Sequence, residues 1–161
     1  MVGRILDFKT EIITPRKVTC QNGGLNLGSP IDIHASDVDF ALLDKIRFVN
    51  YKESGTVNIT NTGHSIMIDG FESWHKKQPY VEKGGFRYRY RLAELHFHWA
   101  QNDSGSEHAI GGLRYPGEIH LVHYRHNLKA SEAAKTPGGI AVLGVFLIVE
   151  KESKPTPEVS L

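Results

Sequence analysis

Residues Leu92–Trp99 read L-A-E-L-H-F-H-W, an alternating pattern that predicts a β-strand. Successive side chains of a strand point to opposite faces of the sheet. Glu94, His96 and His98 therefore share one face, while the residues between and beside them on the other face are apolar. On this strand the two imidazoles would lie about 6.8 Å apart and point into the same space.

A second stretch, Glu118–Tyr124, reads E-I-H-L-V-H-Y and predicts another strand. The residues between the two stretches are numerous enough to form a loop that returns the chain antiparallel. Adjacent strands lie about 4.8 Å apart, so His120 can complete a triangle with His96 and His98. His123 has the opposite parity and is expected to be a core or hydrogen-bonding histidine.

Three imidazoles that converge from two strands match the ligand set of a catalytic zinc site, in which zinc keeps a fourth position for water. Metal-bound histidines usually donate their second N–H to a carboxylate or a carbonyl group. Glu94 and Glu118 share faces with the histidines and are expected to fill that role. A lone H-x-H pair is more often structural, but the third histidine and the two glutamates favour metal binding. His75 and His126 are expected at the surface.

Two other interpretations of this region are weaker. Cupin barrels also place H-x-H on a strand, but with a glutamate close behind it, and here Glu107 follows His98 only after nine residues. Alternating aromatic residues and arginines in Phe86–Arg91 could stack on nucleic acid and neutralise it. Because the net charge is only +1 and there is no second basic patch, a strand with solvated arginines is favoured over nucleic-acid binding.

Composition places the chain among globular proteins. Its 161 residues suit one domain, and 40% of them are hydrophobic, which argues against disorder. No apolar run approaches the roughly 18 residues of a transmembrane helix. The charged N-terminus lacks the apolar core of a signal peptide, and the single cysteine, Cys20, can form no intrachain disulfide. These features predict a cytoplasmic protein or a piece of a larger one.

Short apolar runs between scattered glycines and prolines predict a mainly β fold. One short helix is expected at Leu128–Lys135. The run Ile140–Val149 is almost continuously apolar, as in strands that are buried on both faces within a sheet. Residues 1–27 show little pattern and the tail 151–161 is polar, which leaves 28–150 as the domain. The other predicted strands are Ile31–His34, Ile46–Tyr51, Thr56–Asn61, Ser65–Asp69, Tyr80–Lys83 and Tyr88–Trp99.

Six segments of the sequence match the motifs of one known family. They are GSPIDI (28–33), TGHSI (62–66), RLAELHFHW (91–99), GSEH (105–108), GEIHLVHY (117–124) and SEAAKTPGGIAVLGVF (131–146). Together they resemble the α-class, eukaryotic-type carbonic anhydrases, from about residue 28 to residue 149. The ordered set LHFHW, GSEH and EIHLVH is highly specific. The resemblance implies a central, twisted and mostly antiparallel sheet with short helices and a zinc site at the bottom of a cone.

The resemblance also implies which residues carry the chemistry. It places the Zn²⁺ ligands on His96, His98 and His120, the same three that strand parity selects. It implies that His64 shuttles the proton and that Glu107 orients a threonine hydroxyl beside the metal.

Further positions follow from the same resemblance. Glu118 corresponds to the carboxylate that supports the third zinc histidine, and Val122 and Val142 correspond to the apolar wall beside carbon dioxide. The implied activity is the reversible hydration of carbon dioxide to bicarbonate and a proton, with no nucleic-acid partner, no membrane segment and no identified protein partner. The alternative is a non-catalytic relative that binds zinc or a protein partner.

Some features depart from the family's pattern. The family's domain continues past the end of this chain, with the threonine that Glu107 orients and with the last strands. An incomplete sheet and impaired activity are therefore expected. The family's Trp-rich N-terminal segment has no counterpart in this sequence. Glu94 stands where the family usually has glutamine, and Thr62 and Met67 replace asparagines that commonly hold proton-carrying waters. Cys20 stands where secreted relatives have a cysteine, so a fragment of a secreted relative is an alternative to a cytoplasmic protein.

Overall fold

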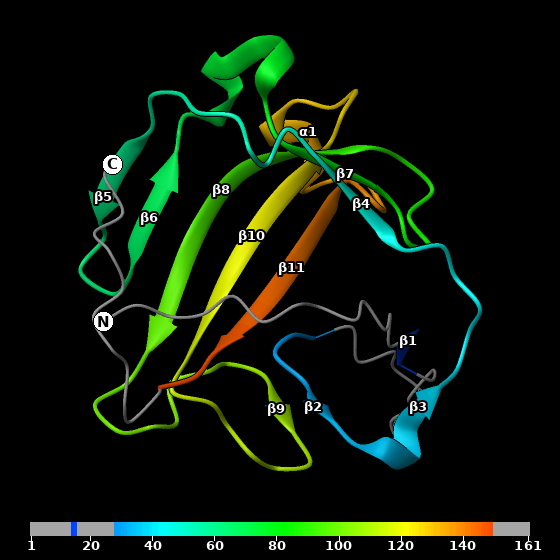
Figure 1. The fold of residues 1–161 in the computed structure, drawn as a ribbon, viewed down its shortest axis with the longest axis vertical. Coiled ribbons are helices and arrows are strands. Elements are labelled where there is room, and N and C mark those ends of the chain that lie inside the picture. Colours follow the sequence, from blue (N-terminus) through cyan, green and yellow to red (C-terminus); the bar gives the residue numbers. More distant parts are fainter. Residues whose placement is uncertain (1–13, 16–27, 150–161) are drawn as a thin grey trace.

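The computed structural model describes residues 14–15 and 28–149, and these form a mainly β fold (Figure 1). The predicted segments 1–27 and 151–161, including Cys20, lie outside the described residues except for residues 14–15. The elements in chain order are β1 (Thr14–Pro15), β2 (Asp32–Ile33), η1 (Ala35–Asp37), β3 (Val38–Asp39), β4 (Ile46–Val49), β5 (Asn58–Asn61), β6 (Ile66–Asp69), η2 (Phe71–Lys77), β7 (Tyr80–Lys83), β8 (Tyr90–Trp99), β9 (Ala109–Ile110), β10 (Gly117–Arg125), α1 (Ala130–Ala133) and β11 (Ile140–Leu147).

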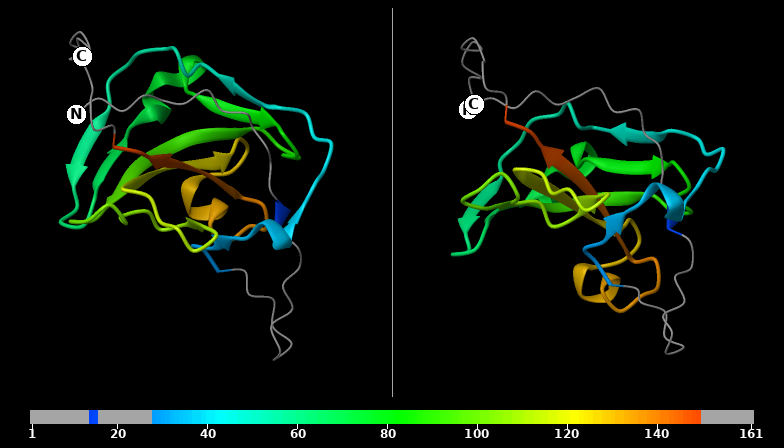
Figure 2. Two further views of the ribbon diagram at one scale, coloured as in Figure 1. Left: turned by 60° about the horizontal axis from the view of Figure 1, so that its bottom comes forward. Right: turned by 90° about the horizontal axis from the view of Figure 1, so that it is seen from below.

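One seven-stranded antiparallel sheet dominates the described part of the chain. Its main path runs β11-β10-β8-β6-β5, and β7 and β4 continue from one end of β8. The sheet is strongly curved, as Figure 2 shows from two further sides. Two small sheets flank it: an antiparallel pair of β1 with β3 and a parallel pair of β2 with β9. The mainly β, mostly antiparallel architecture that the sequence predicts is therefore confirmed.

The pairing of β8 with β10 positions the histidines. His120 lies directly opposite His96, and Glu118 lies opposite His98. A register shift, or bulge, follows between Val122 and His123, and the pairing then resumes with His123 opposite Leu92. The antiparallel return expected between the two histidine-bearing strands is thus what the structure contains.

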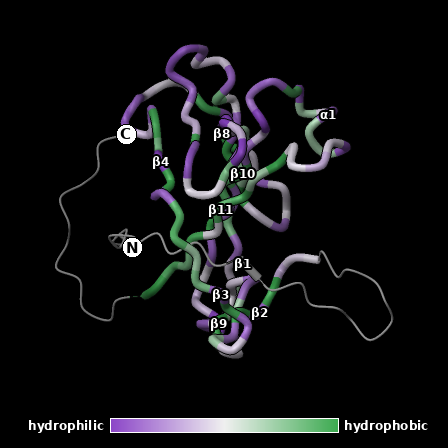
Figure 3. The backbone as a smooth tube through the Cα atoms, turned by 90° about the vertical axis from the view of Figure 1, so that its right-hand side faces the viewer, coloured by the Kyte–Doolittle hydropathy of each residue, from purple (hydrophilic) through white to green (hydrophobic). Residues whose placement is uncertain are grey.

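The opposite face of the sheet is apolar. Leu121 lies opposite both Leu95 and Leu143, and Leu95 lies opposite Ile68, so one row of aliphatic side chains crosses four strands. These side chains remain half-buried. Hydrophobic stretches follow strands such as β4, whereas several connecting turns are hydrophilic (Figure 3). The most deeply buried apolar cluster lies elsewhere, at the β7 end of the sheet, where Val81 is completely buried.

The strand β11 differs from its prediction. The apolar run was expected to lie within the sheet and to be buried on both faces, but β11 pairs only with β10 among the described residues. Ile140 and Val142 are exposed, with 50% of Val142 accessible. A strand that is hydrophobic on both faces is stabilised when both faces are buried. The sequence of the strand does not identify the segment that buries them.

Other boundaries shift by a few residues. The predicted helix is shorter than expected, since α1 covers only Ala130–Ala133 of Leu128–Lys135. At its start the Lys129 N–H donates to Glu132 Oε2. Several short elements give no clear sequence signal, namely β3, β9 and the 3₁₀ segment η2. No helix in the described ranges has the length and apolar character needed to cross a membrane.

Candidate metal centre

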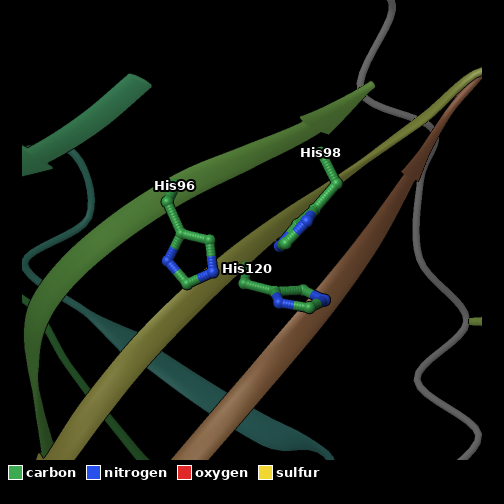
Figure 4. A group of neighbouring side chains, drawn as sticks. All are labelled: His96, His98 and His120. Atoms are coloured by element: carbon green, nitrogen blue, oxygen red, sulfur yellow. The ribbon is translucent and has the colours of Figure 1, made fainter. Parts of the chain in front are cut away.

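Three histidines from two adjacent strands point toward one another (Figure 4). His96 and His98 come from β8, and His120 comes from β10. Their ring centroids are 5.0 Å apart for His96 and His98, 5.3 Å for His96 and His120, and 4.5 Å for His98 and His120. One nitrogen of each ring lies within 4.8 Å of the other two, so the group could hold a metal ion.

The donor set fits zinc because the nitrogen atoms are available as neutral ligands. His98 Nε2 is buried and has no hydrogen-bond partner among the described residues. Burial, together with the neighbouring His120 and His96, lowers the pKa of His98 below its ordinary value, although Glu107 acts in the opposite direction. A buried imidazole nitrogen without a partner is costly unless it binds something. Its lone pair is therefore free for a metal.

Glu118 fixes His120 from the side away from the other two imidazoles. Glu118 is only 1% exposed, and its Oε1 lies 2.8 Å from His120 Nε2. Oε1 also lies 2.7 Å from His108 Nδ1, and Oε2 accepts the backbone N–H groups of Glu107 and His108. Burial alone would raise the pKa of Glu118, but these hydrogen bonds lower it below the ordinary value. An ionised Glu118 accepts the Nε2 proton of His120 and leaves Nδ1 as a ligand atom.

Two further carboxylates approach the histidines. Glu94 Oε1 lies 3.3 Å from His96 Nδ1, so it is placed on the outer nitrogen of that ring, as strand parity suggested. Glu107 Oε2 lies 3.5 Å from His98 Nε2 and 3.7 Å from His120 Nδ1. Glu107 therefore approaches nitrogens on the inner side of the cluster.

A glycine makes room for Glu118. Gly144 of β11 lies opposite His120, and a Cβ atom at this position would lie 2.6 Å from Glu118 Oε1. Real Cβ atoms essentially never approach another atom so closely. The buried carboxylate therefore depends on the absence of a side chain in the neighbouring strand.

The remaining predicted site residues lie in different surroundings. His64 is exposed in the turn between β5 and β6, where its N–H donates to Thr62 Oγ1 over 3.4 Å. Val122 and Val142 lie directly opposite each other on β10 and β11. No described contact joins His64 to the three histidines.

His123 is buried, as its parity predicted. It is 0% exposed, its Nδ1 donates to the Leu121 carbonyl over 2.9 Å, and its Nε2 accepts the Tyr51 hydroxyl at 2.5 Å. His75 and His126 are exposed, as expected. The parity rule therefore separates the clustered histidines from the others.

Sequence reasoning missed the residues that hold the loop beside the cluster. The GSEH segment is visible as a motif, but nothing in it assigns His108 a partner. His108 links the Ser29 hydroxyl, 3.1 Å from its Nε2, to Glu118. Arg114 donates to the backbone carbonyls of Ser106 and Glu107. The contact with Ser29 joins segments far apart in sequence, and the others span an irregular loop, so no strand or helix periodicity could reveal them.

A second group of possible metal ligands consists of His108, Glu118 and His120. Here a single oxygen, Glu118 Oε1, lies within hydrogen-bond distance of a nitrogen of each histidine. Ordinary hydrogen bonds thus account for the contacts among these three side chains. The His96, His98 and His120 group is therefore the better metal-site candidate, because it contains the unpartnered nitrogen.

Residues 17–160 match the family model of eukaryotic-type carbonic anhydrases. The chain belongs to this family. The relative named "Putative carbonic anhydrase 5" from Caenorhabditis elegans is 54% identical over 120 residues, which is 74% of this chain and 39% of the relative. Mouse carbonic anhydrase 1 is 39% identical over 127 residues, covering 77% of this chain and 48% of the relative.

Human carbonic anhydrase 7 is similar to the same extent. It is 38% identical over 122 residues, which is 74% of this chain and 46% of the relative. The chain thus matches half or less of the length of these carbonic anhydrases. The family membership that the histidine-bearing segments indicated is confirmed.

Proposed function

We propose that this chain binds Zn²⁺ through His96, His98 and His120 and catalyses the reversible hydration of carbon dioxide to bicarbonate and a proton. The observation that carries the proposal is the set of three imidazoles with ligand atoms within 4.8 Å of one another. The buried, unpartnered His98 Nε2 supports it. Family membership supports the reaction class.

Zinc in a three-histidine site supplies a hydroxide nucleophile at neutral pH, because the metal lowers the pKa of water. The chain's own residues position the ligands. Glu118 accepts the Nε2 proton of His120, and Glu94 is placed to accept the Nδ1 proton of His96. These contacts orient the rings and raise their basicity.

Further side chains are proposed to contact the substrate and to carry the released proton. Val122 and Val142 form an apolar pair beside the histidine face and are proposed to contact carbon dioxide. His64 is proposed to relay the released proton to solvent, since its side chain is exposed and histidine is the usual proton carrier of proteins. Glu107 is proposed to orient, through its carboxylate, a hydroxyl group beside the metal.

A non-catalytic role as a zinc-binding or partner-binding relative is the second candidate. The described residues leave large apolar side chains accessible, among them Phe40 and Leu42, which are almost fully exposed. Apolar groups exposed in this way often mark contact surfaces. Carbon dioxide hydration separates the two candidates, because only the enzyme turns over.

The test is stopped-flow hydration of carbon dioxide by the zinc-loaded chain, with the His64→Ala and His126→Ala variants. We expect turnover in the wild type, a lower rate in His64→Ala that an imidazole buffer restores, and no change in His126→Ala. A zinc-loaded wild type without turnover would favour the non-catalytic candidate. Equal rates for wild type and His64→Ala at low buffer concentration would remove His64 from the proton path.

A further inference from the structure

Arg114, in the loop between β9 and β10, contacts two consecutive backbone carbonyl groups. Its Nη1 donates to the carbonyl of Ser106 and, over 2.9 Å, to the carbonyl of Glu107. Each carbonyl shares a peptide group with the N–H of the following residue, so these peptide groups also carry the N–H groups of Glu107 and His108. Both N–H groups donate to Glu118 Oε2, over 3.0 and 2.9 Å. Two peptide groups therefore lie between a guanidinium and a buried carboxylate.

This arrangement strengthens the hydrogen bonds at both ends of each peptide group. A cation that binds a carbonyl oxygen polarises the peptide group, which makes the N–H on its other side a better donor. A carboxylate that accepts this N–H makes the carbonyl a better acceptor in the same way. Hydrogen bonds to charged partners are also stronger than those between neutral groups. Arg114 thus strengthens the hold on Glu118 through the backbone that lies between them.

The loop brings Arg114 back to these carbonyls. Gly111 and Gly112 have positive φ angles of 59° and 79°, which glycine adopts without strain, and the chain reverses there. After the reversal the Ser106 N–H donates to the Tyr115 carbonyl over 2.9 Å, and the Tyr115 N–H donates to Ser106 Oγ over 2.8 Å. The backbone next to Arg114 is therefore fixed beside the peptide groups that the guanidinium binds.

Glu118 connects this loop to the three-histidine cluster. Its Oε2 accepts the two backbone N–H groups, while its Oε1 lies 2.8 Å from His120 Nε2. Only 1% of Glu118 is exposed, so its carboxylate depends on protein groups for its hydrogen bonds. Loss of the Arg114 contacts would loosen the two N–H donors and, through them, the carboxylate that orients the His120 ring.

We propose that Arg114 is a positioning residue of the metal centre, because it holds the peptide groups that fix Glu118, and Glu118 fixes His120. The inference rests on the proposed zinc site and deepens it by assigning a role to a residue outside the ligands and their direct partners. The sign of its effect separates it from simple electrostatics. Removing a positive charge near a cation site should tighten cation binding, whereas loss of a positioning contact should weaken it.

The zinc affinity of the full chain, measured by competition with a chromophoric chelator, tests this sign. Arg114→Ala is expected to weaken zinc binding by about tenfold, at the lower end of the range for groups that support a ligand. Arg114→Lys keeps a cationic donor and should recover part of the loss. The matched control is Arg87→Ala, which removes an exposed arginine before β8 and should bind zinc as the wild type does.

Two outcomes of these measurements would overturn the inference and leave the three-histidine site intact. The first is zinc binding in Arg114→Ala that is as tight as in the wild type, or tighter. The second comes from a double-mutant cycle with Glu118→Gln. If Arg114 acts through Glu118, the loss of affinity in the double variant is smaller than the product of the two single losses. Losses that multiply in full would show that Arg114 acts by another route.

Amide hydrogen exchange of the metal-free chain, followed by NMR, gives a readout that needs no zinc. The amides of Glu107 and His108 should exchange faster in Arg114→Ala than in the wild type or Arg87→Ala. The amide of Leu92, which donates to the Pro79 carbonyl, should exchange at the same rate in all three. Unchanged exchange at both loop amides would also overturn the inference. A wild type that binds no zinc would contradict the proposed site, and with it the metal-binding role of Arg114.

Discussion

Glu118 Oε1 lies 2.8 Å from Nε2 of His120, and this contact determines which nitrogen of the ring faces His96 and His98. The carboxylate is buried and also binds His108 and two backbone N–H groups, and these contacts hold it beside the ring. The orientation of the His120 ring is thus set by a network that reaches back to Ser29.

Replacing Glu118 tests this network. Glu118→Gln is expected to weaken zinc binding by about 10–100-fold without removing the site, because the amide keeps the shape but loses the charge that accepts two imidazole protons. Competition with a chromophoric chelator measures the affinity. Glu72→Gln, at an exposed position of η2, is the control and should bind zinc as the wild type does. A fall of one in the coordination number measured by X-ray absorption would instead make Glu118 a ligand.

Gly144→Ala tests the space that Glu118 needs. The new Cβ would lie 2.6 Å from Glu118 Oε1, so either the carboxylate or β11 must shift. We expect weaker zinc binding together with a loss of about 1–3 kcal/mol in the free energy of unfolding, as for other overpacked sites. Gly63→Ala is the control, because its positive φ of 85° costs roughly 1–2 kcal/mol while nothing lies near its Cβ. It should lose stability but keep its zinc affinity, and weaker zinc binding in Gly63→Ala alone would contradict the packing argument.

His123 predicts an acid-sensitive fold. Burial lowers the pKa of His123 from 6.5 to about 4. Between these values the unfolded chain binds the proton and the folded chain does not, so stability is complete above pH 6.5 and falls as the pH drops toward 4. The loss from this one group amounts to about 3 kcal/mol in the metal-free chain.

Urea unfolding of the metal-free chain at several pH values measures this dependence. His123→Phe cannot titrate and should show a shallower decline between pH 6.5 and 4, whatever its stability at neutral pH. His126→Ala, which removes an exposed histidine, should decline as the wild type does. Parallel curves for His123→Phe and the wild type would show that another group causes the acid sensitivity.

Much of the site could be predicted from the sequence because strand periodicity is local. Parity alone selects His96 and His98 as a pair, and it separates His120 from His123 three strand positions later. The direct pairing of His120 with His96 depends on register, which a sequence pattern does not fix. Parity predicts that the side chains share a face, and register decides that they meet.

The parts that could not be predicted depend on contacts distant in sequence. The role of Gly144 follows from a carboxylate on the neighbouring strand, and that of His108 in part from the Ser29 hydroxyl, 79 residues away in sequence. The place of β11 at the end of the sheet path depends on which segments pair with it, and hydrophobicity does not specify a partner. Such features are properties of the assembled fold.

Zinc content per folded chain tests the central proposal most directly. After loading with zinc and dialysis, metal analysis of the folded fraction compares the wild type with His120→Ala, His123→Ala and His126→Ala. We expect one zinc per chain in the wild type, in His123→Ala and in His126→Ala, and none in His120→Ala. Of the three substituted histidines, only His120 belongs to the three-histidine cluster. Stoichiometric zinc in His120→Ala, or equal loss of zinc in His120→Ala and His126→Ala, would contradict the assignment of His96, His98 and His120 as the metal site.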